Sequence, residues 1–195
     1  AEAAAAVAAS LDAYKFNDAA GAIYQFTWGT FCDWYLEFTK PILAGSDSDA
    51  IAETRAATAW VLDQILRMMH PFTPFITEEL WAEMDDAREG LLIFENWPNF
   101  GDSLAAPGAA EEMDWVVRLI TVVRSVRSEM NVSPKVKLPL LLKNAGEAAF
   151  SHAAKHRDLI TRLGRLSGIE HISDEIPKGA VQALLDEATV VLPLA

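Results

Sequence analysis

The sequence has few of the residues that build disulfide-rich, metal-bound or membrane proteins. Cys32 is the single cysteine among 195 residues, which excludes an internal disulfide and a cysteine-rich zinc module. The purely apolar stretches are far shorter than the roughly 20 residues that a membrane span needs, so we expect no membrane partner. The alanine-rich start lacks the basic and bulky apolar regions of a signal peptide. Together these absences predict a cytoplasmic protein.

Catalytic signatures are also missing. The chain has no glycine-rich phosphate loop, no G-x-S-x-G and no H-E-x-x-H. His152 and His156 have the spacing of a two-histidine metal face, but without an obvious third ligand a solvated helix face is the preferred interpretation. His70 is expected to meet the last carbonyls of a helix, and Cys32 to be a small core residue. We therefore predict no catalytic residue, no metal and no cofactor in this chain.

Positive charge is scarce, which argues against bulk attraction to nucleic acid. The chain has 16 Lys+Arg against 28 Asp+Glu, a net charge of −12. The two halves differ, because residues 1–108 hold the acidic excess. Between Trp115 and Arg165 the basic residues outnumber the acidic ones, which are Glu129, Glu147 and Asp158. Such asymmetry keeps a nucleic-acid partner in consideration.

Apolar residues in the first half recur at helical spacing. The clearest stripe consists of Ile23, Phe26, Phe31, Trp34 and Phe38. It predicts a helix over 17–40 that Pro41 ends. A second helix is expected to be capped by Ser48 or Asp49, and a third to begin at Pro74. With the N-terminal segment, these predict an antiparallel helical bundle.

The second half changes character after a long amphipathic helix. The expected elements are a helix over 113–130, a strand over 135–143, a helix over 147–166 and short strands over 169–173 and 189–194. Pro139 cannot donate to a ladder, so its strand is expected to lie at an edge or to be irregular. The chain is thus predicted to be mainly α, with a helical bundle over 1–108 and a small α+β subdomain over 109–195.

The helix over 17–40 carries more aromatic residues than one buried face requires. Trp28, Tyr35 and Leu36 fall away from the main stripe. Core packing explains most of the aromatic residues, but part of this second face should reach a neighbour or a ligand. Aromatic and flat aliphatic groups stack on unpaired bases with about 1–3 kcal/mol each, so a single-stranded RNA loop is one candidate.

Residues 123–137 provide a second candidate site. Arg124 and Arg127 are three residues apart on the expected helix surface, Asn131 follows one turn later, and Lys135 lies beyond. Planar guanidinium groups on one face suit phosphate oxygens. The alternative is a helix with solvated arginines that contact no ligand.

Several stretches resemble valyl-tRNA synthetase, a class I aminoacyl-tRNA synthetase. LDAYKFNDAAGAIYQFTWGTFCDWYLEFTKPIL (11–43) is similar to its anticodon-binding helical domain. MMHPFTPFITEELW (68–81) is similar to a motif that the valyl, isoleucyl and leucyl enzymes share. VRSVRSEMNVSPKVKLPLLLK (123–143) and PKGAVQALLDEATVVLPLA (177–195) resemble the small α+β region that follows in the valyl branch.

The resemblance implies a modular enzyme that attaches valine to tRNA(Val) with ATP. It places catalysis, editing, ATP and Mg²⁺ upstream of Ala1, since the chain has no class I nucleotide-binding signature. It also implies that the first bundle helix is missing and that a coiled-coil arm would follow the subdomain. The expected partner is tRNA(Val) without DNA, and the fragment is expected to be an inactive monomer.

The resemblance also suggests which residues touch RNA. It places the end of the aromatic helix beside the anticodon, with Leu36 as an apolar contact to a base and Asp33 and Trp34 in support. The residues that match the family's R-x-x-R-x-E-M-N segment, and that would hold the RNA backbone, are Arg124, Arg127, Asn131 and Lys135.

Two other functions remain open at this point. A helical protein-interaction module would use the exposed aromatic residues of 17–40 to bind a partner helix. The equivalent domain of an isoleucyl- or leucyl-tRNA synthetase is the other alternative, disfavoured by the absence of a cysteine-rich zinc module.

Overall fold

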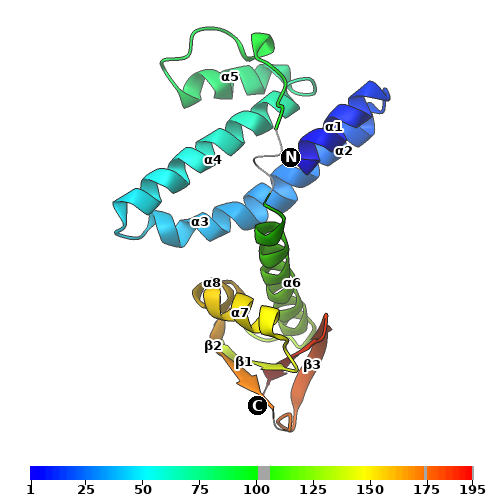
Figure 1. Ribbon diagram of the computed structural model, residues 1–195, viewed down its shortest axis with the longest axis vertical. Helices are drawn as coiled ribbons and strands as arrows, with labels where there is room; N and C mark the ends of the chain where they lie inside the picture. Colours follow the sequence, from blue (N-terminus) through cyan, green and yellow to red (C-terminus); the bar gives the residue numbers. More distant parts are fainter. Residues whose placement is uncertain (101–105, 174, 195) are drawn as a thin grey trace. The chain divides into compact units, whose positions relative to one another are not determined.

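The computed structural model describes residues 1–100, 106–173 and 175–194. The chain divides into two compact units, Ala1–Ala105 and Ala106–Ala195. The described part of the first unit contains only helices and connections, whereas the second combines helices with a four-stranded sheet (Figure 1). The predicted combination of a mainly helical chain and a small sheet is therefore confirmed. The predicted boundary at 108/109 lies in the first turn of α6 (Pro107–Glu129).

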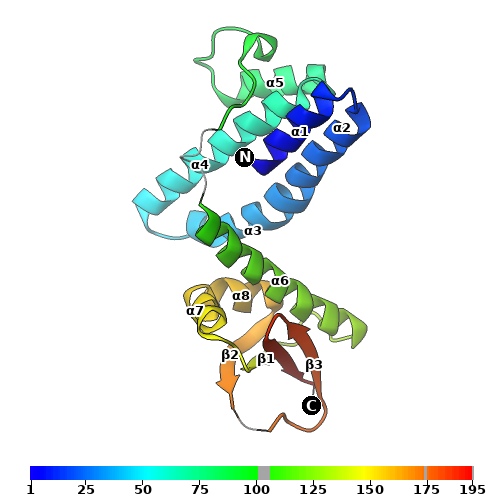
Figure 2. The same ribbon diagram turned by 45° about the vertical axis from the view of Figure 1, so that its right-hand side comes forward.

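The helices of the first unit pack on their neighbours in the chain. They are α1 (Glu2–Asp12), α2 (Phe16–Gln25), η1 (Phe26–Tyr35), α3 (Leu36–Leu43), α4 (Ser48–Met69), α5 (Pro74–Met84) and η2 (Leu92–Phe94). α1 packs on α2, and α4 contacts α2, α3 and α5. Figures 1 and 2 both show α1 alongside α2. One apolar core between these helices consists of Ala4, Val7, Ala19, Ile23 and Met68.

The helix predicted over 17–40 differs from the expectation in two ways. Its middle, η1, is a π-helix, whose wider turn changes which side chains face the core. Phe31 is buried there, Cys32 is only half-buried, and Trp28 is 59% exposed. The prediction that Pro41 ends the helix is wrong, since α3 continues to Leu43. Proline has a helical φ, and its missing N–H leaves only one bond unmade so close to the helix end.

The start of α4 is capped by an aspartate that the sequence reading did not choose. Asp47 accepts hydrogen bonds at Oδ1 from the backbone N–H groups of Asp49 and Ala50, both at 3.1 Å. The predicted caps, Ser48 and Asp49, are wrong because the helix begins one residue earlier than expected. Asp47 adopts an extended backbone, which is the geometry of an N-cap.

The turn between α4 and α5 includes a side-chain contact that links the two helices. α5 begins at Pro74 as predicted. His70 follows α4, and its ring Nδ1 lies 2.8 Å from the hydroxyl of Thr77 in α5. The expectation that His70 meets the last carbonyls is therefore wrong. The ring instead joins two consecutive helices.

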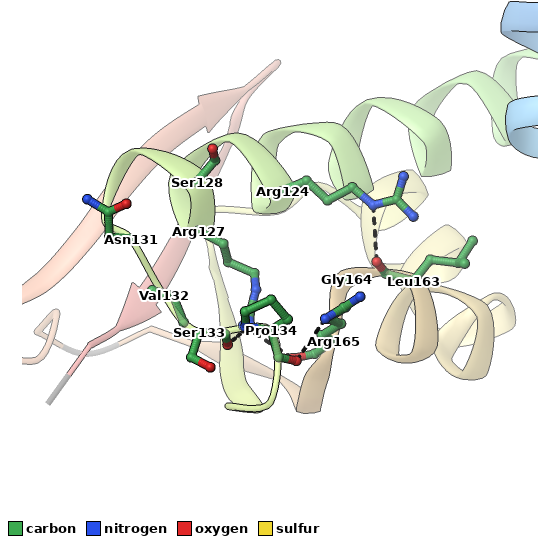
Figure 3. Close-up of a pocket in the computed structure, with 10 residues that line it drawn as sticks. All are labelled: Arg124, Arg127, Ser128, Asn131, Val132, Ser133, Pro134, Leu163, Gly164 and Arg165. Atoms are coloured by element: carbon green, nitrogen blue, oxygen red, sulfur yellow. Dashed lines mark hydrogen bonds between the residues drawn. The ribbon is translucent and has the colours of Figure 1, made fainter.

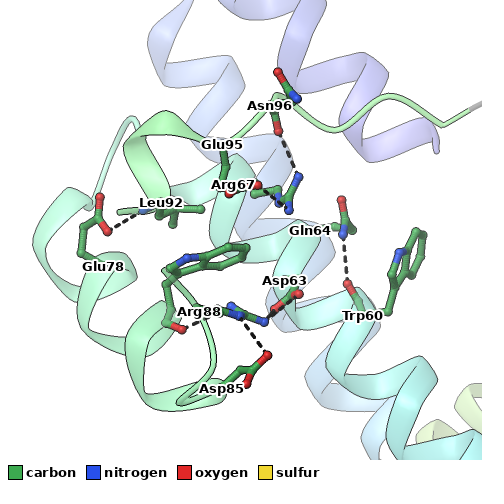
Figure 4. Close-up of polar contacts among 11 residues, drawn as sticks. Trp60, Asp63, Gln64, Arg67, Glu78, Asp85, Arg88, Leu92, Glu95 and Asn96 are labelled. Atoms are coloured by element: carbon green, nitrogen blue, oxygen red, sulfur yellow. Dashed lines mark hydrogen bonds and ion pairs between the residues drawn. The ribbon is translucent and has the colours of Figure 1, made fainter. Parts of the chain in front are cut away.

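The connection after α5 is fastened to α4 and α5 by charged groups (Figure 4). Arg88 donates to both carboxylate oxygens of Asp63, at 2.8 and 2.9 Å, and lies 3.8 Å from the centroid of the Trp81 ring. Glu78 accepts from the backbone N–H groups of Leu92 and Ile93 at 2.7 and 3.0 Å. These contacts give the segment a fixed path on the helices.

The sheet of the second unit has the strand order β2-β1-β4-β3. Its strands are β1 (Leu138–Lys143), β2 (Leu166–Ile172), β3 (Ala180–Leu185) and β4 (Ala188–Pro193). β1 and β2 are parallel and are joined through α7 (Glu147–Lys155) and α8 (Arg157–Gly164), while β4 is antiparallel to β1 and β3. The prediction of one helix over 147–166 is wrong, because it breaks at His156. β3 was not predicted.

Pro139 lies in an inner strand, so its predicted edge position is wrong. The alternative expectation, an irregularity, is confirmed by a register shift between Leu138 and Pro139. Leu140 and Leu142 are fully buried, as are Ile120 and Val123 of α6. No helix in the described ranges is long and apolar enough to cross a membrane.

The two histidines of 147–166 take part in an ion cluster between α6 and α7. Glu112 of α6 pairs with Lys155 at 2.8 Å and with the ring of His156, and His152 Nδ1 lies 4.0 Å away. Hydrogen bonds from Lys155 and His156 lower the pKa of Glu112 to about 2. Both rings are half-buried, so the predicted solvated face is wrong. Among the described residues, no group of three His, Cys, Asp or Glu could hold a metal ion.

Replacing the observed cap should cost more than replacing the expected one. Asp47→Ala is expected to lower the free energy of unfolding of the helical unit by about 1 kcal/mol, because two N–H groups lose their acceptor. The control Ser48→Ala should change it by less than half as much. Urea titration followed by tryptophan fluorescence measures this, since Trp115 is the only tryptophan outside the unit. Equal effects would contradict the assigned cap.

The Glu112 cluster should make the second unit sensitive to acid. Because the pKa of Glu112 in the folded chain lies below the ordinary glutamate value of 4.5, the ionised carboxylate stabilises the unit above that value, and the contribution disappears as the pH falls toward 2. Glu112→Gln should therefore lower the thermal midpoint at neutral pH, and the gap to the wild-type chain should close in acid. A gap that is independent of pH would contradict the role of this carboxylate.

Candidate nucleic-acid interface

The C-terminal half of α6, the loop after it and the end of α8 surround an open groove of about 550 Å³. Its lining residues are Arg124, Arg127, Ser128, Asn131, Val132, Ser133, Pro134, Leu163, Gly164 and Arg165. Figure 3 shows the side chains of α6 on one side of it and Leu163 and Arg165 on the other. We call it the first groove. It contains three of the predicted RNA-binding residues, Arg124, Arg127 and Asn131.

Close packing of α8 on α6 brings the two walls of the first groove together. Gly164 ends α8, and a Cβ atom there would lie 3.1 Å from Leu166 Cδ1 and 3.3 Å from Val123 Cγ1. A larger residue there would crowd the side chains of Leu166 in β2 and Val123 in α6. Arg165 follows with a φ of +53°, which turns the chain into β2. The Nε of Arg124 donates to the carbonyl of Leu163 at 3.1 Å, across the groove.

Arg127 is the buried centre of this region. Arg127 is only 6% exposed, so the prediction that its guanidinium lies on the helix surface is wrong. The physical reason is helical periodicity, since Arg127 follows Ile120 and Val123 on the face that packs against the core. Burial, and to a lesser extent the charge of Arg165, lowers the pKa of Arg127.

The guanidinium of Arg127 is bonded only to backbone carbonyl groups. Nη2 donates to Ser133 at 3.1 Å and to Val136 at 2.7 Å, and Nη1 donates to Arg165 at 3.3 Å. No carboxylate in the described part of the chain lies within ion-pairing distance of it. The buried guanidinium of Arg127 thus bonds three carbonyl groups in two separate segments of the chain. Its charge has no paired anion.

Asn131 is placed by the way α6 ends. Its φ of +50° is left-handed, and the N–H groups of Asn131 and Val132 donate to the carbonyls of Ser128 and Arg127 at 3.1 and 2.9 Å. Asparagine tolerates this conformation better than most residues, which explains its position after the helix. Its exposed amide stands at the end of the first groove (Figure 3).

A second groove of about 480 Å³ adjoins the first. Its lining residues are Pro134, Lys135, Lys137, Asp158, Thr161, Arg162 and Arg165. Pro134 and Arg165 border both grooves, and Arg165 Nη1 donates to the Pro134 carbonyl at 2.9 Å. Asp158 is the one carboxylate in either lining. We call the two grooves together the basic saddle.

Sequence reasoning placed Lys135 at this surface but did not select Arg162 and Arg165. These two residues come from the end of α8 and the residue after it, far along the chain from Lys135. The excess of basic residues between Trp115 and Arg165 was the available signal. Proximity in space could not be read from it, because the break of the helix at His156 was not foreseen.

The other predicted RNA-binding residues lie in the helical unit. Asp33 and Trp34 belong to η1 and Leu36 begins α3; Asp33 is exposed and the other two are half-buried. Tyr35 is not available as a second-face aromatic, because its hydroxyl lies 3.2 Å from Thr58 Oγ1 of α4. The structure therefore places the seven predicted residues in two groups, one in each unit.

Comparison with known proteins assigns the greater part of the chain to one family. Residues 1–142 match the family described as the anticodon-binding domain of tRNA ligase. This stretch contains all described helices of the first unit, together with α6 and most of β1. It contains both groups of predicted residues.

The chain is also similar to part of several curated bacterial proteins. It is 46% identical to the valine–tRNA ligase of Granulibacter bethesdensis over 186 residues, which covers 95% of this chain and 21% of the relative. The corresponding protein of Caulobacter vibrioides is 45% identical over 192 residues, covering 97% and 21%. That of Rhizobium meliloti is 43% identical over 191 residues, covering 96% and 20%. The chain thus spans about a fifth of the length of these relatives.

Arg127 and Arg124 should differ sharply in their effect on stability. Arg127→Ala leaves three carbonyls without their donor and is expected to cost about 2–4 kcal/mol in the second unit. Arg124→Ala, the matched change one turn earlier, should cost at most about 1 kcal/mol, because the side chain is exposed. Hydrogen exchange of the β1 and β4 amides measures both values. Similar costs would contradict the internal role of Arg127.

Proposed function

Because the chain belongs to the family of anticodon-binding domains of tRNA ligases, we propose that it binds tRNA as the anticodon-reading part of a valine–tRNA ligase. The observation that carries this proposal is the family match over residues 1–142. The relatives named above are all valine–tRNA ligases, which supports valine as the amino acid. The cognate partner is then tRNA(Val).

The helical unit, as an antiparallel bundle, recognises the anticodon by shape and stacking. Leu36 contacts an anticodon base, while Asp33 and Trp34 support it. The Trp34 and Phe38 rings lie 5.9 Å apart, which gives this stretch a rigid apolar base. The acidic excess of residues 1–108 limits non-specific attraction to phosphates, so a base contact has to supply selectivity.

The α+β unit holds the RNA backbone. Arg124, Asn131 and Lys135 reach the open surface of the basic saddle. Cationic side chains there neutralise phosphates independently of the base sequence of the RNA. Arg127 contributes to backbone binding indirectly, because its hydrogen bonds hold the loop after α6 in place. Binding divided in this way between a base contact and backbone contacts explains why the charge of the chain is so unevenly distributed.

The remaining activity belongs to the whole ligase. Activation of valine with ATP and Mg²⁺ takes place in parts of the enzyme outside this chain, which is itself inactive. The protein acts in the cytoplasm as a monomer, and the bound tRNA presents its distant end to the catalytic part.

A protein-interaction module is the second candidate, and one observation favours it. Phe75 of α5 is 91% exposed and Phe94 of η2 is 83% exposed. Exposed aromatic rings of this size often mark contacts with other protein surfaces. A tRNA ligase domain can also use them to contact the rest of its own enzyme, so this candidate does not exclude RNA binding.

The proposal predicts discrimination by the anticodon. Fluorescence anisotropy should show that the wild-type chain binds a tRNA(Val) transcript more tightly than one with a substituted anticodon. Leu36→Ala is expected to weaken binding of the cognate transcript roughly tenfold, the loss of one stacking contact. It should also narrow the difference between the two transcripts.

The control is Leu43→Ala, the same change at an exposed position near the end of α3. It should leave the affinity within about twofold of the wild-type value, as expected of a surface substitution away from the site. If both transcripts bind the wild-type chain equally, anticodon recognition by this chain is refuted. A stable complex with a protein and none with tRNA would favour the second candidate.

A further inference from the structure

We propose that the basic saddle is a preorganised site for consecutive phosphates of an RNA backbone. The RNA backbone passes from one groove to the other over the ridge that Pro134 and Arg165 form between them. The buried Arg127 adds positive charge to this site. The inference rests on the proposed tRNA binding and adds where and how the backbone is held. It also assigns contacts to Lys137 and Arg162, which the sequence reading did not select.

The buried charge of Arg127 has no paired anion in the described part of the chain. Its donors meet three carbonyl groups, which satisfy hydrogen bonds but carry no net negative charge. A buried cation is normally paired with an anion, because desolvation is costly and the interior screens charge weakly. The first groove opens directly beside this guanidinium. An anion bound in the groove would supply the missing opposite charge.

The loop that the two grooves share is held rigidly. Arg127 fixes the carbonyls of Ser133 and Val136, so the backbone on both sides of Pro134 is tied down. Arg165 is tied to the same loop by its own carbonyl, which accepts from Arg127, and by its Nη1, which donates to Pro134. The ridge between the grooves therefore has a fixed shape before any ligand binds. Such preorganisation lowers the entropic cost of binding.

The linings of both grooves combine cations with hydroxyl groups. Exposed cations stand in both grooves, Arg124 in the first and Lys135, Lys137 and Arg162 in the second. Hydroxyl groups stand beside them, from Ser128 and Ser133 in the first groove and Thr161 in the second. Cations with neighbouring hydroxyl donors are the groups that contact phosphate and ribose in nucleic-acid complexes.

The two grooves are large and continuous with each other. The two grooves hold about 550 and 480 Å³, which is much more than one small anion fills, and they share Pro134 and Arg165. A continuous polyanion can therefore occupy both. The hydroxyl donors and planar guanidinium groups favour a phosphodiester chain over an acidic peptide, whose carboxylates are irregularly spaced.

The test is the salt dependence of tRNA binding by the intact chain. Arg162→Gln and Lys137→Gln should each weaken binding of the tRNA(Val) transcript about fivefold to tenfold and reduce the slope of log K against log salt by about one. Lys178→Gln is the matched control, since it removes one exposed charge of the same unit outside both grooves. Its slope should equal that of the wild-type chain.

Asp158→Asn provides a change of opposite sign. It removes the single carboxylate of the two linings, so tRNA should bind roughly threefold more tightly, because the local potential becomes more positive. Weaker or unchanged binding by Asp158→Asn would count against a polyanion in the second groove. This variant keeps every hydrogen bond of the Arg127 cluster, so its result does not depend on the folding of a core variant.

Arg127 itself needs a pair of variants. Arg127→Lys keeps the buried charge but cannot reach all three carbonyls, whereas Arg127→Met removes both the charge and the bonds. If the charge contributes, Arg127→Lys should retain the wild-type salt slope at reduced affinity, while Arg127→Met should lower the slope as well. Equal slopes in both variants would overturn the electrostatic role of Arg127.

The outcomes separate this inference from the proposed function. A wild-type chain that binds no tRNA refutes both. A chain that distinguishes anticodons but shows wild-type slopes in Arg162→Gln and Lys137→Gln refutes the basic saddle alone. Competition by polyglutamate at the concentration at which a tRNA competitor acts would assign the surface to an acidic peptide, and would also overturn the inference.

Discussion

The contacts of one guanidinium organise the α+β unit. Arg127 sits on the buried face of α6 and bonds the loop after that helix and the residue that ends α8. The loop follows α6 directly, whereas the end of α8 lies much further along the chain. Apolar contacts could not fix the positions of these carbonyl groups as closely as hydrogen bonds do. The price is a buried positive charge without a paired carboxylate. A protein that binds a polyanion can use such a charge, because the ligand itself completes the ion pair.

The proposed function divides tRNA recognition between the two units. The helical unit is acidic and carries its candidate contacts on a stretch that includes a π-helix, a geometry often found at functional sites. The α+β unit carries its cations in adjoining grooves with fixed walls. Base contacts specify and phosphate contacts position, so the separation suits a domain that must do both. The net charge of −12 conceals this division.

Much of the fold followed from the sequence, because apolar periodicity locates helices and proline and glycine locate their ends. The predictions from sequence were wrong where tertiary contacts determine the local structure. β3 was missed because its burial depends on pairing with β4, and Pro139 lies in an inner strand because an irregular register accommodates it. Similarly, Asp47 and Ser48 are both plausible caps in the sequence, and only the backbone conformation distinguishes them. The candidate site shows the same limit, since Arg127 resembles a surface arginine until its position on the helix face is known.

Hydrogen exchange of the intact chain with and without tRNA(Val) tests most directly whether both units bind tRNA. We expect tRNA to protect the backbone amides in two separate stretches, around Asp33–Leu36 in the helical unit and around Asn131–Lys137 with Arg162–Arg165 in the α+β unit. The β3–β4 hairpin, which lines neither groove, should exchange at the same rate in both states. Protection confined to one unit, or centred on the hairpin, would contradict a domain that reads the anticodon with one unit and holds the backbone with the other.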